Sequence, residues 1–128
     1  MRTDWDNVFK IRTTNPDKSR DKHEVVKLLL VRALMRKHSR NMFIRIYTEF
    51  RLDNGAIPDV YFENLRTKEA YAFEIQKNMS NKWLKEIKEK YKNYQAPFFD
   101  TFDYIIIDLS EFSDNINEIR EKVEEYVV

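Results

Sequence analysis

Residues 55–77 read GAIPDVYFENLRTKEAYAFEIQK and predict two β-strands joined by a polar turn. The first run begins at Asp59, directly after a proline, which can begin a strand but cannot continue a central one. The second run, 70–76, alternates with the period of two that is typical of a half-buried strand. We therefore expect an antiparallel hairpin centred on Arg66-Thr67.

Pairing about this turn places Asp59 opposite Glu74. One face of the hairpin is then apolar and consists of Val60, Phe62, Tyr71, Phe73 and Ile75. The other face carries Asp59, Glu74 and Gln76 beside the small residues Ala70 and Ala72. Arg-Thr does not suit a type I′ turn, so even-numbered register shifts, which preserve both faces, stay open.

Two carboxylates that converge at a strand end repel each other unless a cation or a proton lies between them. Carboxylate oxygens suit Mg²⁺ or Mn²⁺, with a backbone carbonyl and waters completing the coordination shell. Such a metal lowers the pKa of bound water and stabilises the charge of an in-line phosphoryl displacement. The carboxylate face of the hairpin therefore predicts nuclease chemistry.

The motif Pro58-Asp59, followed after a turn by Glu74-Ile75-Gln76, resembles the PD-(D/E)xK nuclease superfamily. This is the restriction-endonuclease-like fold, which also includes Holliday-junction resolvases. Gln76 occupies the place of the family's usual lysine, and several branches of the superfamily carry glutamine there. The resemblance covers residues 21–109.

This resemblance implies a Mg²⁺- or Mn²⁺-dependent deoxyribonuclease in which Asp59, Glu74 and the backbone carbonyl of Ile75 hold the metal. Gln76 is then expected to orient the attacking water or the scissile phosphate by hydrogen bonds. It cannot supply the charge of the usual lysine, so Lys77 or Lys82 is expected to approach the phosphate instead. The implied product carries a 5′-phosphate, and a homodimer like that of junction resolvases is one candidate assembly.

Glu24 stands near the start of the predicted first helix, one turn before Leu28, and is expected to lean toward the buried side. The resemblance implies that it completes the metal site as a catalytic and metal-binding residue. The spacing Asp21-x-x-Glu24 also matches a capping box, in which Glu24 would bond back to the N-cap amide. Both uses place Glu24 at a helix start, and the sequence leaves them open.

The whole chain, 1–128, predicts a single domain of the α/β class, with a mixed central sheet flanked by helices in the order α-β-β-β-α-β-α. An irregular N-terminal arm (1–20) precedes the core (21–109), and a C-terminal helical segment (113–128) follows. Besides the hairpin, apolar periodicity and turn signals predict helices at 21 to about 38, 82 to about 94 and 114 to about 126, and strands at 42–52 and 103–109. The strand 103–109 has the composition of one buried on both faces, and the preceding helix predicts a parallel crossover to it.

Composition limits the function further. Charged residues make up 35% of the chain, but the formal net charge is +1, which excludes a uniformly basic nucleic-acid coat. The sequence contains no cysteine, which fits an intracellular protein. It shows no apolar run of membrane-spanning length, no signal-peptide pattern and no glycine-rich nucleotide-binding loop. We expect DNA as the partner, no membrane contact and no nucleotide cofactor.

The predicted second helix is rich in lysine. Lys77, Lys82 and Lys85 are the candidate DNA-binding residues, because a basic helix directly after the metal-binding strand suits a phosphate backbone. A solvated helix with Glu–Lys pairs is the more common origin of such a pattern. His23 and His38 lack partners at metal-ligand spacing and are expected at the surface or at a helix cap.

Two functions from different classes remain, besides a small α/β protein of unrelated function in which the order of the motifs is a coincidence. The first is the metal-dependent deoxyribonuclease, with the catalytic set Asp59, Glu74, Gln76 and Glu24. The second is a catalytically degenerate DNA-binding or assembly module with the same fold, which Gln76 and the near-zero net charge favour. Unpaired carboxylates in a fold interior cost stability, so three retained acidic residues favour the nuclease.

Overall fold

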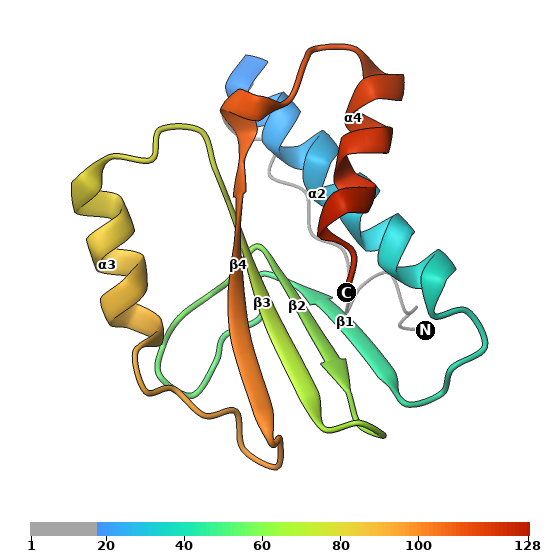
Figure 1. The fold of residues 1–128 in the computed structure, drawn as a ribbon, viewed down its shortest axis with the longest axis vertical. Coiled ribbons are helices and arrows are strands. Elements are labelled where there is room, and N and C mark those ends of the chain that lie inside the picture. The colour runs from blue at the N-terminus through green and yellow to red at the C-terminus, as the bar shows by residue number, and fades with distance from the viewer. Residues whose placement is uncertain (1–17) are drawn as a thin grey trace, which may run out of the picture.

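The computed structural model of the chain describes residues 18–128, which form one mixed sheet with helices on both faces (Figure 1). The order along the chain is α-β-β-β-α-β-α, as predicted. The elements are α2 (Lys18–Lys37), β1 (Ile44–Thr48), β2 (Val60–Asn64), β3 (Glu69–Gln76), α3 (Asn81–Tyr91), β4 (Thr101–Asp108) and α4 (Ile116–Val123), with short 3-10 turns at Leu109–Glu111 and Glu124–Tyr126. The predicted N-terminal arm lies outside the described residues up to residue 17. Its last residues, 18–20, belong to α2 instead.

The hairpin has the predicted register. Strands β2 and β3 pair antiparallel with Val60 opposite Phe73, so Asp59 precedes β2 at the level of Glu74. A four-residue turn joins them, closed by Lys68 with a φ of 57°. The carboxamide oxygen of Asn64 accepts hydrogen bonds from backbone N–H groups in this turn. The longer turn explains how the register forms without a type I′ sequence.

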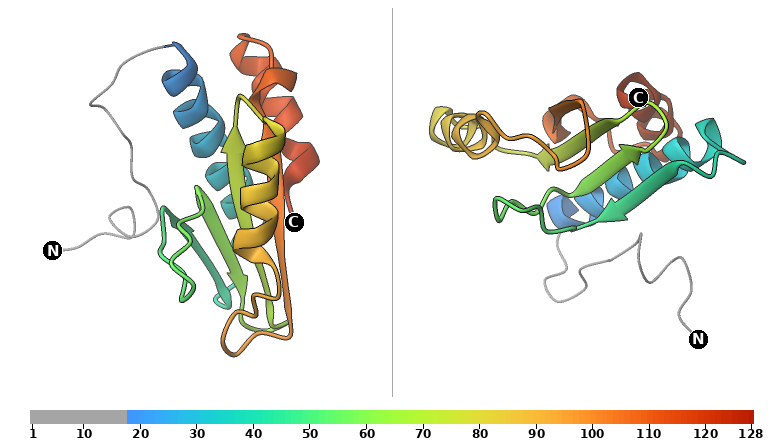
Figure 2. Two further views of the ribbon diagram at one scale, coloured as in Figure 1. Left: turned by 90° about the vertical axis from the view of Figure 1, so that its left-hand side faces the viewer. Right: turned by 90° about the horizontal axis from the view of Figure 1, so that it is seen from below.

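The sheet has the strand order β1-β2-β3-β4, in which only β3 and β4 are parallel. Its predicted apolar face packs against α2 and α4, through residues such as Val60, Phe73 and Ile107. Its other face packs against α3, where Ala70 and Ala72 leave room for the ring of Tyr91. In Figure 2, α3 accordingly lies apart from α2 and α4, which are neighbours.

Two strand predictions are wrong. The strand expected at 42–52 ends at Thr48, because Glu49 adopts a positive φ of 52° that turns the chain away. Ile46 and Leu52 therefore belong to opposite cores rather than to one face. The strand expected to be buried on both faces, β4, is an edge strand of the sheet, and Ile107 is its only buried residue.

The helices differ from expectation mainly at their ends. Because α2 begins at Lys18, Asp21 lies within its first turn and cannot be the N-cap of a capping box. Ser80 caps α3, which ends at Tyr91 rather than at about 94, and Leu84 on this helix is exposed. Asn115 caps α4, which begins at Ile116 rather than at 114, and Ile116 is exposed. No helix within residues 18–128 is long and apolar enough to cross a membrane.

Candidate active site

Asp59 owes its position to the start of β2. Pro58 has no N–H to donate to the ladder, so regular pairing begins after it. The carboxylate of Asp59 accepts a 2.7 Å hydrogen bond from the Ile75 N–H of the neighbouring strand. Its other oxygen, Oδ1, lies 3.2 Å from Nε2 of His23 on α2. The carboxylate thus lies at the strand end, between the sheet and the first helix.

Glu74 is held from the opposite side, by α3. Its side chain is buried, and the Tyr91 hydroxyl donates a 2.6 Å hydrogen bond to Oε1. Nζ of Lys90 lies 4.0 Å from the same oxygen. The end of α3 is itself anchored, because the Asn54 side chain donates a hydrogen bond to the Lys90 carbonyl at 2.9 Å.

Burial raises the pKa of Glu74 above its ordinary value of 4.5. The negative charge of Asp59 raises this pKa further, whereas the hydrogen bond from Tyr91 and the charge of Lys90 lower it without reversing the shift. In the same contact, burial and the charge of Glu74 raise the pKa of the Tyr91 hydroxyl, which therefore stays protonated and donates. The ionised form of Glu74 is thus less favourable in the folded protein than in the unfolded chain.

We expect Glu74→Gln to raise the free energy of unfolding at neutral pH. The folded-state pKa of Glu74 is raised, so the stability that its neutral form contributes is fully present below pH 4.5 and is lost as the pH rises through the folded-state value. The amide imitates the neutral carboxyl and still accepts from Tyr91. Denaturant unfolding between pH 4 and 8 should show a gain that shrinks toward acid. A pH-independent difference would contradict this.

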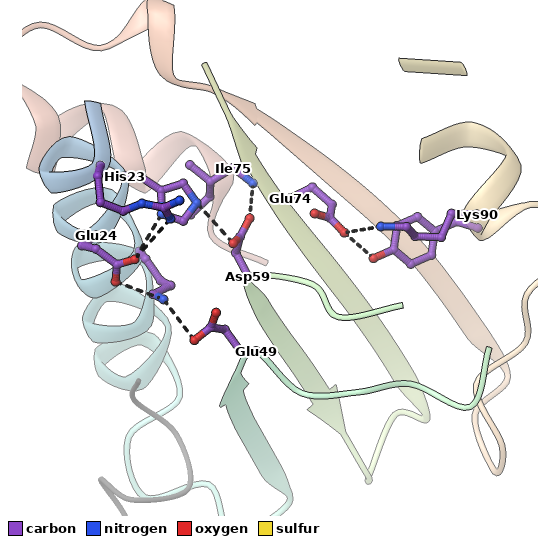
Figure 3. Close-up of polar contacts among 10 residues, drawn as sticks. His23, Glu24, Glu49, Asp59, Glu74, Ile75 and Lys90 are labelled. Carbon is purple, nitrogen blue, oxygen red and sulfur yellow. Dashed lines mark hydrogen bonds and ion pairs between the residues drawn. The ribbon is translucent and has the colours of Figure 1, made fainter. Parts of the chain in front are cut away.

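A buried cluster of charges adjoins the site on α2 (Figure 3). Lys27 is fully buried, with its Nζ 3.1 Å from Oε2 of Glu24 and 4.0 Å from Oε2 of Glu49. The other carboxylate oxygen of Glu24 lies 3.5 Å from Nδ1 of His23. The ring of His23 therefore links Glu24 to Asp59. This chain of contacts fixes the side of the site that α2 provides.

Asp59 and Glu74 open onto one cleft of about 430 Å³, between the N-terminal part of α2, the end of β3 and α3. Its charged and polar lining consists of Arg20, His23, Asp59, Glu74, Gln76, Lys77, Asn78 and Lys90. Its apolar lining consists of Ile75, Trp83, Ile87 and Leu109. Figure 3 shows His23 on one side of the two carboxylates and Lys90 on the other. Arg20 from α2 and Lys90 from α3 thus bring cationic side chains to the same cleft.

No protein-family model, no curated protein and no solved structure matches this chain. Across residues 18–128, no group of three or more histidine and acidic side chains is placed to hold a metal ion. Among the residues that line the cleft, Asp59 and Glu74 are the two that bring carboxylate oxygens.

The structure brings together most, but not all, of the predicted site residues. Gln76 and Lys77 line the cleft with the two carboxylates. Consecutive residues of a strand point to opposite faces, but β3 ends at Gln76, so this alternation does not apply to Lys77. Glu24 is buried as expected but does not line the cleft, since Lys27 and His23 hold it. Lys82 and Lys85 are exposed on α3 outside the cleft.

Sequence reasoning missed three residues of the site. His23, expected at the surface or a cap, is only 14% exposed and contacts both Glu24 and Asp59. Lys90 and Arg20 bring cations to the cleft from α3 and α2. A signal was present for the α2 residues: positions 20, 23, 24 and 27 follow the i, i+3, i+4, i+7 spacing of one helix face, and all four are charged or titratable.

Proposed function

We propose that this protein is a metal-dependent deoxyribonuclease that hydrolyses phosphodiester bonds in the cleft between α2 and α3. One observation carries the proposal: Asp59 and Glu74, which lie level with each other at adjacent strand ends, line one cleft together with Arg20, Lys77 and Lys90. Neighbouring carboxylates suit a divalent cation, and flanking ammonium and guanidinium groups suit phosphate oxygens. Structural ion pairs alone would not require an open cleft at this position.

The topology supports a restriction-endonuclease-like core. Three antiparallel strands, a crossing helix and a fourth, parallel strand follow the first helix, which packs on the apolar face of the sheet. Pro58-Asp59 directly precedes β2 and Glu74-Ile75-Gln76 ends β3, so the motif lies at adjacent ends of the two central strands, which agrees with the resemblance to PD-(D/E)xK nucleases. Both the strand order and the placement of the motif thus favour the same assignment.

The donor set fits Mg²⁺ or Mn²⁺. Mg²⁺ in enzymes is commonly bound by one or two carboxylates, with waters and substrate phosphate oxygens completing its shell. Asp59 and Glu74 are two such carboxylates, and the Ile75 carbonyl is the candidate backbone donor. Binding a cation would also relieve the unfavourable ionisation of Glu74. When bound, the metal would lower the pKa of a water and stabilise charge on the phosphate.

The other residues of the cleft position the substrate. In the proposed reaction the oxygen of a water bonds to phosphorus and the bond from phosphorus to the 3′ oxygen breaks. A proton from the attacking water passes to the 3′ oxygen, which leaves as a hydroxyl. The side chain of Gln76 donates a 3.2 Å hydrogen bond to the Asn78 carbonyl in the structure. In the reaction it would form a hydrogen bond with the water or the phosphate instead. Lys90 would supply the positive charge that Gln76 lacks. Glu24 acts indirectly, by orienting His23 against Asp59.

We expect Lys90→Ala to reduce the DNA cleavage rate by roughly a hundredfold, because it removes the cation closest to Glu74. Lys90→Arg, which keeps the charge, should retain a larger part of the rate. Lys88→Ala is the matched control, since Lys88 is exposed on the same helix but does not line the cleft. Equal losses in the Lys88 and Lys90 variants would show that only the general charge of α3 matters.

The function is tested by incubating the protein with a panel of DNA substrates in Mg²⁺, in Mn²⁺ and in EDTA. The panel contains a four-way junction, a flap, nicked duplex, single strands and supercoiled duplex. The proposal expects cleavage of at least one substrate, with metal only. A purified, folded protein that cleaves none of them with either metal would overturn it.

A second function is favoured by one specific observation. Each carboxylate of the cleft already has partners within the protein: His23 and the Ile75 N–H for Asp59, and Tyr91 and Lys90 for Glu74. Such an arrangement also suits a catalytically degenerate module that binds DNA or a partner without metal. This module would show no rise in melting temperature with Mn²⁺, whereas the nuclease should.

A further inference from the structure

We propose that the cleft receives an unpaired nucleotide, whose base stacks on Trp83 while its phosphate lies against Lys90 and the carboxylates. This inference rests on the proposed function and deepens it, because it assigns single-stranded or frayed DNA, rather than continuous duplex, as the substrate. The juxtaposition of an indole ring, three cationic side chains and the carboxylate pair within one cleft carries it.

Trp83 occupies a defined place in the first turn of α3. Its backbone N–H donates a 3.1 Å hydrogen bond to Oγ of Ser80, the N-cap of the helix. Its side chain is half-buried: part of it packs against the core between α3 and the sheet, and part of it lines the cleft. Trp83 therefore belongs both to this core and to the wall of the cleft.

The charges around Trp83 suit a nucleic-acid strand. Proteins that bind single strands combine cationic side chains, which follow the phosphates, with aromatic rings on which bases stack. In the cleft, Lys77 follows β3, Lys90 lies about two turns beyond Trp83 on α3, and Arg20 approaches from α2. The cleft volume of about 430 Å³ falls within the range of roughly 300–1,000 Å³ that is usual for ligand sites.

The conformation of the DNA follows from the geometry of stacking. In a continuous duplex both faces of every base are covered by neighbouring bases, so no face is available to an indole ring. Enzymes that act within a pocket therefore bind single strands or extrude the nucleotide, which costs least where the base is already unpaired. A flap, a strand end or a single strand meets this condition without that cost.

Binding in EDTA tests the inference separately from catalysis. A fluorescently labelled single strand and a DNA dumbbell, which is a duplex closed at both ends by non-nucleotide linkers and so contains no unpaired nucleotide, are titrated with protein and followed by anisotropy. Trp83→Leu preserves an apolar side chain for the core but removes the ring, whereas Trp83→Phe keeps a smaller ring. We expect Trp83→Leu to weaken single-strand binding about tenfold, Trp83→Phe to weaken it less, and neither variant to change dumbbell binding.

Phe98→Leu is the matched control, because Phe98 is an aromatic side chain that is 94% exposed and lies outside the cleft. It should leave the binding of both DNAs unchanged. In a Trp5→Phe background, Trp83 is the single remaining tryptophan, and its emission should be quenched by the single strand but not by the dumbbell. Circular dichroism and melting temperature establish that each variant is folded.

The inference is overturned if folded Trp83→Leu binds the single strand with the affinity of the wild type. It is also overturned if this variant loses affinity for the single strand and for the dumbbell by the same factor. Its failure is distinguishable from failure of the nuclease. Cleavage that depends on Asp59 and Glu74 but not on Trp83 would retain the nuclease and remove the stacking site. Trp83-dependent single-strand binding without any cleavage would retain the stacking site and remove the nuclease.

Discussion

Asp59→Ala and Glu74→Ala should each abolish metal-dependent DNA cleavage, lowering the rate by about a thousandfold or more. Each variant removes one of the two carboxylates available to hold a cation in the cleft. A metal contributes several kcal/mol to a phosphoryl displacement, and each ~1.4 kcal/mol corresponds to a factor of ten in rate. The rates are compared on whichever DNA of the panel the wild type cleaves.

The isosteric variants Asp59→Asn and Glu74→Gln separate lost chemistry from lost folding. Glu74→Gln is expected to be more stable than the wild type at neutral pH, so its inactivity cannot be attributed to unfolding. Glu89→Gln, an exposed acidic residue of α3 outside the cleft, should remain fully active. Mn²⁺ should raise the melting temperature of the wild type and of the Glu89 variant, but not of the Asp59 and Glu74 variants.

The outcome that contradicts this prediction is equal cleavage by the wild type and all four cleft variants. The activity would then come from another site or another protein in the preparation. Retained Mn²⁺ stabilisation in both alanine variants would likewise show that the cation binds elsewhere.

Lys27→Met is expected to lower the free energy of unfolding by about 3–5 kcal/mol. Lys27 is fully buried, and its ammonium group lies 3.1 Å from Glu24 and 4.0 Å from Glu49. Methionine has a similar length and fills the same space, so packing is largely preserved. The cost arises because Glu24 would keep a buried charge without its nearest cation. Denaturant unfolding at pH 7 measures the change.

A double-mutant cycle tests the cause of that loss. Lys27→Met combined with Glu24→Gln should be less destabilised than the sum of the two single variants, since the pair is removed together. Arg36→Ala is the matched control from the same helix: its ion pair with Glu124 at 2.9 Å is more than half exposed, and its loss should cost about 1 kcal/mol or less. Additive effects of the Lys27 and Glu24 substitutions would contradict the coupling.

The sequence by itself determined the hairpin and its two faces. Its period of two placed Val60, Phe73 and Ile75 toward the main core, and its turn position placed Asp59 level with Glu74. The order of elements and the parallel pairing of the last strand were also predictable, because a strand, a helix and a second apolar strand in succession favour a crossover. The hairpin depends on residues close together in the chain, and the crossover depends on the succession of neighbouring elements.

Only the tertiary structure decided which helix residues meet the carboxylates. His23 and Lys27 reach Asp59 and Glu49 across more than twenty positions of sequence, and Lys90 reaches Glu74 because α3 packs over Ala70 and Ala72. Periodicity within a helix defines its faces, but not the angle or height at which it crosses a sheet. The same limit explains β4, whose apolar composition predicted a central strand: strand order arises from packing between elements, which no single element encodes.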